Sequence, residues 1–142
     1  MKLFAAILSL AACTLAQRLH IAQPSAGATL HGGEFFTLSL TQDQSLGALQ
    51  QVAITVSATP CYDVCGAPAQ WGPGTVLYSG KFHPRANASA PQAGHAQDFR
   101  VQMPSFGAAT GVALAVAHQF KAGGATLVDV FEYYTDVMVT VQ

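Results

Sequence analysis

The chain has 142 residues, a length that suits one domain and leaves little room for two. Only 9% of the residues are charged, where a typical soluble domain has ~25%, and 6 Lys and Arg nearly balance 7 Asp and Glu. Because the Lys and Arg residues form no cluster, the sequence lacks the electrostatic footprint of a nucleic-acid-binding or membrane-surface protein.

The N-terminal segment 1–16 has the pattern of a secretory signal peptide. A positive charge at Lys2 is followed by an apolar run, and Thr14 and Ala16 are small residues two positions apart directly before Gln17. We therefore expect cleavage between Ala16 and Gln17, which leaves a secreted mature chain.

The same region allows one alternative and excludes another. Leu10–Cys13 also fits a bacterial lipoprotein box, in which Cys13 would be kept and carry the lipid. The apolar run 3–10 is far shorter than the ~20 residues that a membrane-spanning helix needs, and no later segment approaches that length. We therefore expect a soluble mature protein.

Hydrophobic side chains after the signal peptide recur with a period of two, as in strands that pack on one face. In chain order, the predicted strands lie at 19–21, 34–41, 52–57, 75–78, 98–103, 112–117 and 136–141. The segment 127–134 either begins the last strand or forms a strand of its own. No segment after the signal peptide has the period of an amphipathic helix.

Turn-forming residues separate these strands. The predicted turns lie at 24–27, 32–33, 58–60, 71–74, 103–107 and 122–124. About seven short strands at this spacing predict an all-β, immunoglobulin- or fibronectin-like antiparallel β-sandwich, which forms a single domain over 17–142. The Ala-, Pro- and Gln-rich stretch 84–96 predicts a mobile loop.

Two covalent features are predicted for the mature chain. Cys61 and Cys65 are an even pair in an exported chain, so a disulfide is the expected state. Because the enclosed loop is short, chain entropy predicts only about 2 kcal/mol of stabilisation, and the bond would pin one loop. Asn87 begins an Asn-Ala-Ser glycosylation sequon within the predicted mobile loop.

Residues for catalysis or metal binding are not grouped in the sequence. The 5 histidines include no pair at i, i+2 or i, i+4, and neither a Gly-x-Ser-x-Gly motif nor a glycine-rich phosphate loop occurs. The carboxylates are scattered, although folding could bring two of them together as in a retaining glycosidase. We therefore predict no enzymatic activity, no cofactor and no bound metal.

Two histidines allow sharper hypotheses. His118 continues the apolar face of 112–116, which favours a strand-end residue with a hydrogen-bonded ring over a ligand or proton-transfer group. His20 could bind copper through its amine and ring only as the first mature residue, and that requires an unfavourable cleavage after Leu19.

The aromatic residues allow a carbohydrate-binding hypothesis. Trp71, together with Tyr78, Tyr133 or Tyr134, could form a platform on which sugar rings stack. The competing interpretation places Tyr78 and one of the adjacent tyrosines in the interior and Trp71 over one end of the sandwich.

A series of short motifs along the mature chain matches a known pattern. They are Pro24, Gly33–Leu38, Val52–Ile54, Gly74–Gly80, Phe99–Pro104, Gly111–Leu114 and Val137–Val141. In order and spacing these motifs resemble the necrosis-inducing secreted protein (Nis-type) family of fungal effectors, particularly its variants with an additional Cys-x-x-x-Cys.

The resemblance implies a secreted, non-enzymatic fungal virulence protein. Members of the family bind the cytoplasmic kinase regions of plant immune receptors and receptor-like kinases, which implies entry into host cells and suppression of immune signalling. The chain departs from the family pattern at Gln42–Leu46 and at 118–124, so no binding residue is transferred. The alternative functions are a secreted carbohydrate- or cell-wall-binding module and, third, a copper-binding secreted protein.

Overall fold

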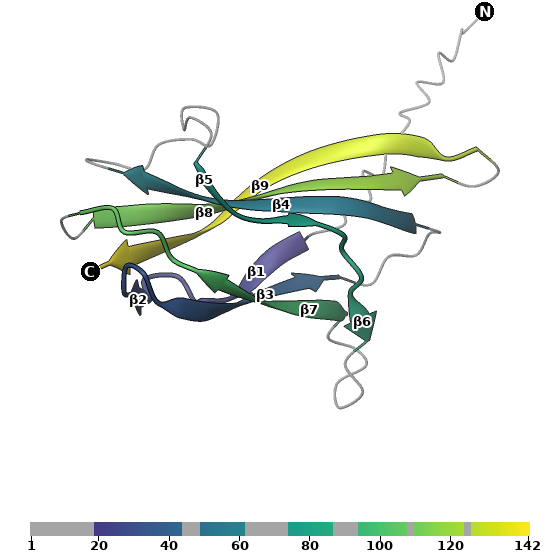
Figure 1. Cartoon of the computed structure of the whole chain (residues 1–142). Coiled ribbons are helices and arrows are strands. Elements are labelled where there is room, and N and C mark those ends of the chain that lie inside the picture. Colours follow the sequence, from purple (N-terminus) through teal and green to yellow (C-terminus); the bar gives the residue numbers. More distant parts are fainter. Residues whose placement is uncertain (1–18, 44–48, 62–73, 87–93, 108–109, 124–125) are drawn as a thin grey trace, which may run out of the picture.

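The structure is a computed structural model that describes residues 19–43, 49–61, 74–86, 94–107, 110–123 and 126–142. Within these ranges the chain forms strands and connecting segments and no helix, so no described helix could cross a membrane (Figure 1). The strands are β1 (Leu19–Gln23), β2 (Thr29–Leu30), β3 (Phe35–Gln42), β4 (Leu49–Cys61), β5 (Thr75–Gly80), β6 (Arg85–Ala86), β7 (His95–Gln102), β8 (Thr110–Ala122) and β9 (Val128–Val141).

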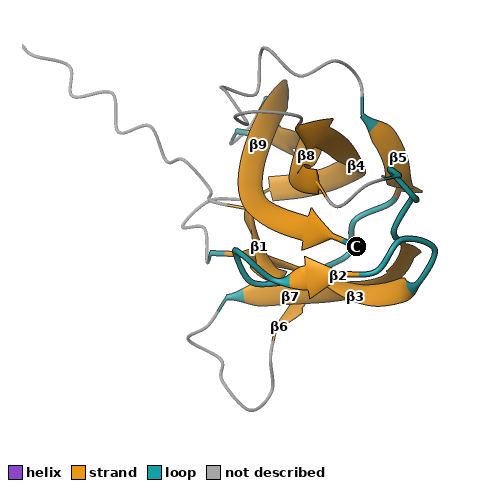
Figure 2. Cartoon of the chain, turned by 90° about the vertical axis from the view of Figure 1, so that its left-hand side faces the viewer, coloured by secondary structure: helices purple, strands orange, loops and turns teal. Residues whose placement is uncertain are grey.

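The strands form two sheets that lie face to face as separate layers (Figure 2). One sheet has the order β1-β3-β7-β6 and the other the order β2-β9-β8-β4-β5. In immunoglobulin terms the first is the A-B-E-D sheet, and β9, β8, β4 and β5 are strands G, F, C and C′ of the second. The predicted all-β, immunoglobulin-like sandwich is confirmed.

One pairing differs from the antiparallel arrangement expected from the sequence. Thr29 and Leu30 of β2 pair in parallel with Thr140 and Val141 of β9, while the other strand pairs are antiparallel. Backbone hydrogen bonds of 2.9–3.0 Å join the segment 28–32 to the last residues of β9. A strand of two residues has too little hydrophobic pattern to be found from the sequence.

The core is formed by alternate residues of each sheet, as the period of two requires. Its buried members include Leu38, Leu40, Ile54, Val56, Phe99, Val101, Val112, Leu114, Val116, Val139 and Val141. In antibody domains a disulfide joins the strands that correspond to β3 and β8. Here these strands contribute leucines to the core, so hydrophobic packing holds the two sheets together.

The central strands extend further than the sequence predicts. β4 and β8 pair from Leu49 opposite Ala122 to Cys61 opposite Gly111. The turn predicted at 58–60 is therefore wrong, since Pro60 lies within β4. Pro60 is tolerated because β5 pairs no further along β4 than Ala58, so that among the described strands only β8 neighbours β4 at this position.

Two other ambiguous segments are assigned by the structure. The stretch from Val128 begins the last strand, which continues without interruption to Val141. The predicted loop 84–96 contains β6 at 85–86 and the first residues of β7, and 87–93 lie outside the described residues.

Gly74 controls how closely β5 approaches β4. A methyl group at Gly74 would overlap the side-chain oxygen of Thr59 and lie 2.6 Å from the carbonyl oxygen of Ala58. We expect Gly74→Ala to displace the start of β5 and to lower the free energy of unfolding by about 2 kcal/mol, the usual cost of overpacking. Urea denaturation measures this change, and the exposed Thr75→Ala serves as the control. Equal stability of the two variants would contradict the prediction.

Candidate functional site: the groove beside β5

β5 is an edge strand with one side open. Among the described strands it pairs with β4 alone and ends the order of its sheet. An edge strand leaves backbone N–H and C=O groups without a neighbouring strand, so it can pair with another chain. The sequence favours a strand here because Thr75 and Val76 are β-branched, and Gly74 and Gly80 flank or end it.

A β-bulge interrupts this strand. Val56 lies opposite Tyr78 and Ser57 lies opposite Val76, so Leu77 is an additional residue on β5. A bulge bends its strand locally and redirects side chains. Val76 is left 57% exposed, while Leu77 is partly buried against the core.

Tyr78 anchors the strand to the opposite sheet. Its ring packs on Phe99 of β7 with 4.5 Å between ring centroids and a tilt of 44°. Its hydroxyl group donates a hydrogen bond of 2.9 Å to the carbonyl oxygen of Lys81. β5 is therefore fixed from the inside, although no strand among the described residues pairs with its outer edge.

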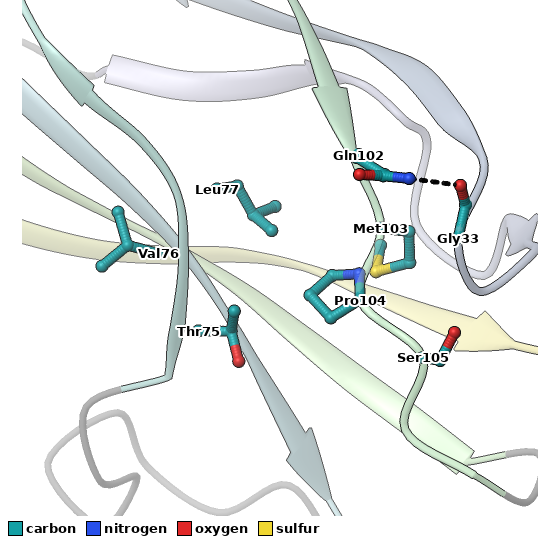
Figure 3. A pocket seen from close by; sticks show the side chains of 8 residues that line it. All are labelled: Gly33, Thr75, Val76, Leu77, Gln102, Met103, Pro104 and Ser105. Atoms are coloured by element: carbon teal, nitrogen blue, oxygen red, sulfur yellow. Dashed lines mark hydrogen bonds between the residues drawn. The ribbon is translucent and has the colours of Figure 1, made fainter.

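A groove of about 490 Å³ lies between β5 and the end of β7. Its lining residues are Gly33, Thr75, Val76, Leu77, Gln102, Met103, Pro104 and Ser105. Figure 3 shows Leu77 and Pro104 on opposite sides of this space, whereas Val76 points away from it. None of the lining residues carries a charge, so the groove combines an apolar floor with neutral polar groups.

The far wall of the groove is held by hydrogen bonds. The Gly33 N–H donates to the Met103 carbonyl (2.8 Å), and the Met103 N–H donates to the Glu34 carbonyl (2.9 Å). The Gln102 side-chain amide donates to the Gly33 carbonyl at 2.7 Å (Figure 3). Gly33 has φ of 83°, a left-handed conformation that glycine adopts without steric cost. These hydrogen bonds join the end of β7 to the segment before β3.

His118 forms a second polar feature, inside the core. Its Nε2 atom lies 2.6 Å from Oε1 of Gln51, and Nε2 of Gln51 donates to Oε1 of Gln42 at 2.9 Å. An amide oxygen only accepts hydrogen bonds, so His118 donates from Nε2, and the neutral form of the ring is the Nε2–H tautomer. Since Gln42 belongs to β3 and the other two residues to β8 and β4, this chain of hydrogen bonds joins the two sheets.

The surroundings of His118 keep it neutral. The ring stacks on Phe120 at 4.8 Å and meets the Phe82 ring edge-on at 5.7 Å, and His118 is 0% exposed. Burial lowers the pKa of His118 from 6.5 to about 4. The expected hydrogen-bonded ring is confirmed for Nε2, whereas Nδ1 is buried without a hydrogen-bond partner. The expected position at a strand end is wrong, because β8 continues past His118 to Ala122.

Most residues singled out in the sequence for processing, modification or stacking lie outside the described residues: Ala16, Gln17, Cys65, Trp71 and Asn87. Signal cleavage, the disulfide and glycosylation therefore stay predictions, and Cys61 is the last residue of β4. His20 lies within β1 opposite Thr41. Within the described ranges, no group of three or more His, Cys, Asp and Glu residues could hold a metal ion.

The low pKa of His118 predicts a pH-dependent stability. An unfolded chain, with a histidine pKa of 6.5, binds the proton more readily than the folded chain, with a pKa of about 4. Stability should therefore be complete above pH 6.5 and fall, on the order of 2 kcal/mol, as the pH drops through this window. Urea denaturation at several pH values measures the slope.

His118→Leu is the variant that tests this assignment. It removes the titrating group, so stability should depend less on pH between 6.5 and 4, whatever its value at neutral pH. The exposed His83→Ala serves as the control and should keep the wild-type slope. An unchanged slope in His118→Leu would show that other groups cause the dependence.

The groove was not predicted from the sequence because three separate segments of the chain build it. The sequence indicated only two parts of its backbone: the ends of β5, at Gly74 and Gly80, and the turn at 32–33. Comparison with known proteins found no family model and no curated protein that matches the chain.

Proposed function

We propose that this protein is a secreted binding protein that holds an extended segment of a partner protein along the β5 edge and its groove. The observation that carries the proposal is the open edge of β5, with Val76 exposed, beside an uncharged groove with an apolar floor. Addition of a strand to an exposed sheet edge is a common mode of peptide recognition.

The two parts of the site have different roles in this binding mode. The open backbone groups of β5 would supply hydrogen bonds that are independent of the partner's sequence. Side chains of an added strand alternate between two faces, so those on one face beside Thr75–Leu77 would enter the groove. There Leu77 and Pro104 favour an apolar side chain, while Gln102 and Ser105 can bind polar groups.

The resemblance to the Nis-type family extends the proposal to a specific partner class. On that basis, the protein is a fungal effector that is translocated into plant cells and binds receptor-like kinases, thereby suppressing immune signalling. The β5 edge suits this contact because it combines backbone pairing with side-chain contacts in the groove beside it.

The alternative functions rest on fewer residues. In the carbohydrate-binding alternative, Tyr78 drops out of the stacking platform because its ring packs on Phe99. Trp71 remains the residue on which that alternative depends, and binding of chitin, glucan and cellulose by Trp71→Ala tests it. N-terminal sequencing tests the copper alternative, since mature chains that begin at Gln17 lack a terminal His20.

Val76→Lys tests the proposed binding edge. A lysine on an edge strand opposes the addition of another strand, and an exposed site tolerates it with about 0.5 kcal/mol or less of stability change. We expect wild-type protein to bind purified cytoplasmic domains of plant receptor-like kinases and Val76→Lys to bind about tenfold more weakly by biolayer interferometry.

The matched control is Val128→Lys on β9. Val128 is 61% exposed, similar to Val76, and is absent from the groove lining. Val128→Lys should therefore bind as the wild-type protein does. Equal losses in both variants, or no loss in Val76→Lys, would place the contact elsewhere.

A further inference from the structure

We infer that the segment held by β5 is acidic at its N-terminal end and apolar at its C-terminal end, an inference that rests on the proposed function. The basis is a row of basic side chains that continues directly from the edge of β5. We call residues 81–85 the basic crossing, because they lead from β5 in one sheet to β6 in the other (Figure 1).

The basic crossing places its three basic residue types at the surface. Lys81, His83 and Arg85 are exposed, whereas Phe82 between them is 0% exposed and belongs to the core. The His83 N–H donates a 2.7 Å hydrogen bond to the side chain of Gln97, which fixes the backbone of the segment on β7. An anchored backbone presents these basic groups at defined positions.

The described carboxylates form no ion pair within 4 Å with the basic crossing. The sequence contains no Asp or Glu between Asp63 and Asp98. Among the described side chains, the ion pair within 4 Å is that of Lys121 with Asp129, so no described carboxylate lies within 4 Å of the charged groups of Lys81 or Arg85. Exposed charges without partners attract a ligand of opposite sign and help to select it.

The position of the basic crossing sets the polarity of the bound segment. An added strand that runs antiparallel to β5, the more stable orientation, starts beside Gly80 and Lys81 and ends beside Thr75. Its first residues would face the basic crossing, and its last residues would face Val76 and the groove. Carboxylates therefore suit its N-terminal end, and apolar side chains suit its C-terminal end.

Other occupants fit this surface less well. A second copy of this chain would offer its own β5, which contains no acidic residue, and the bulge at Leu77 bends the edge away from a straight partner strand. Nucleic acid binds through many phosphate contacts, while the groove beside β5 is uncharged. A flexible acidic peptide can pair with the open backbone groups of β5 and also place carboxylates beside Lys81 and Arg85.

Selection of random dodecapeptides displayed on phage tests the inference. On the wild-type protein we expect enriched peptides with Asp or Glu in the first half and Val, Ile or Leu in the second. On the double variant Lys81→Glu/Arg85→Glu, enriched peptides should instead carry Lys or Arg in the first half. Lys121→Glu makes the same type of charge change on β8 and should leave the acidic preference unchanged.

The outcomes separate this inference from the proposed function. One outcome is that the wild-type protein enriches peptides without an acidic preference and that Val76→Lys abolishes this enrichment. It would overturn the inference and leave the proposed binding edge intact. No enrichment at all, or enrichment unaffected by Val76→Lys, would overturn both. As a second measurement, the affinity of a selected acidic peptide should fall about tenfold between low and high salt, because exposed charges are screened. An affinity independent of salt would also overturn the inference.

Discussion

The ladder between β4 and β8 is the interaction on which the remaining structure depends. It runs from Leu49 opposite Ala122 to Cys61 opposite Gly111 and forms the centre of the five-stranded sheet. Its inner side chains supply much of the core, and β5 and β9 attach to its two sides. Because β5 pairs with β4, the ladder determines where the open edge of β5 lies, and therefore where the groove beside it lies.

The alternation of hydrophobic residues predicted most of this fold because each strand buries one face. Leu38 and Leu40, or Val112 and Leu114, are recognisable within a few neighbouring residues, and so is the inward position of His118. The extension of β4 through Pro60 was missed because a local turn signal was outweighed by pairing with a distant strand. The groove was missed for a related reason, since contacts between separate segments create it.

The hydrogen-bonded chain from His118 to Gln42 shows how a polar group is accommodated in this core. Burying it costs free energy unless its hydrogen bonds are made, and Gln51 satisfies one ring nitrogen while linking two strands. Apolar packing tolerates small shifts of one sheet over the other, whereas hydrogen bonds require definite distances. The network therefore favours one alignment of β3 against β4 and β8.

The parallel pairing of β2 with the end of β9 has a mechanical consequence. Thr140 and Gln142 donate to the carbonyl groups of Ala28 and Leu30, and Gly32 donates to the carbonyl of Gln142. A force that pulls β1 and the end of β9 apart acts parallel to the two paired strands, β2 and β9. It therefore loads the three hydrogen bonds between them at the same time, in shear. A peeling geometry would break them one after another, so this short strand gives the sandwich more resistance to stretching than its length suggests.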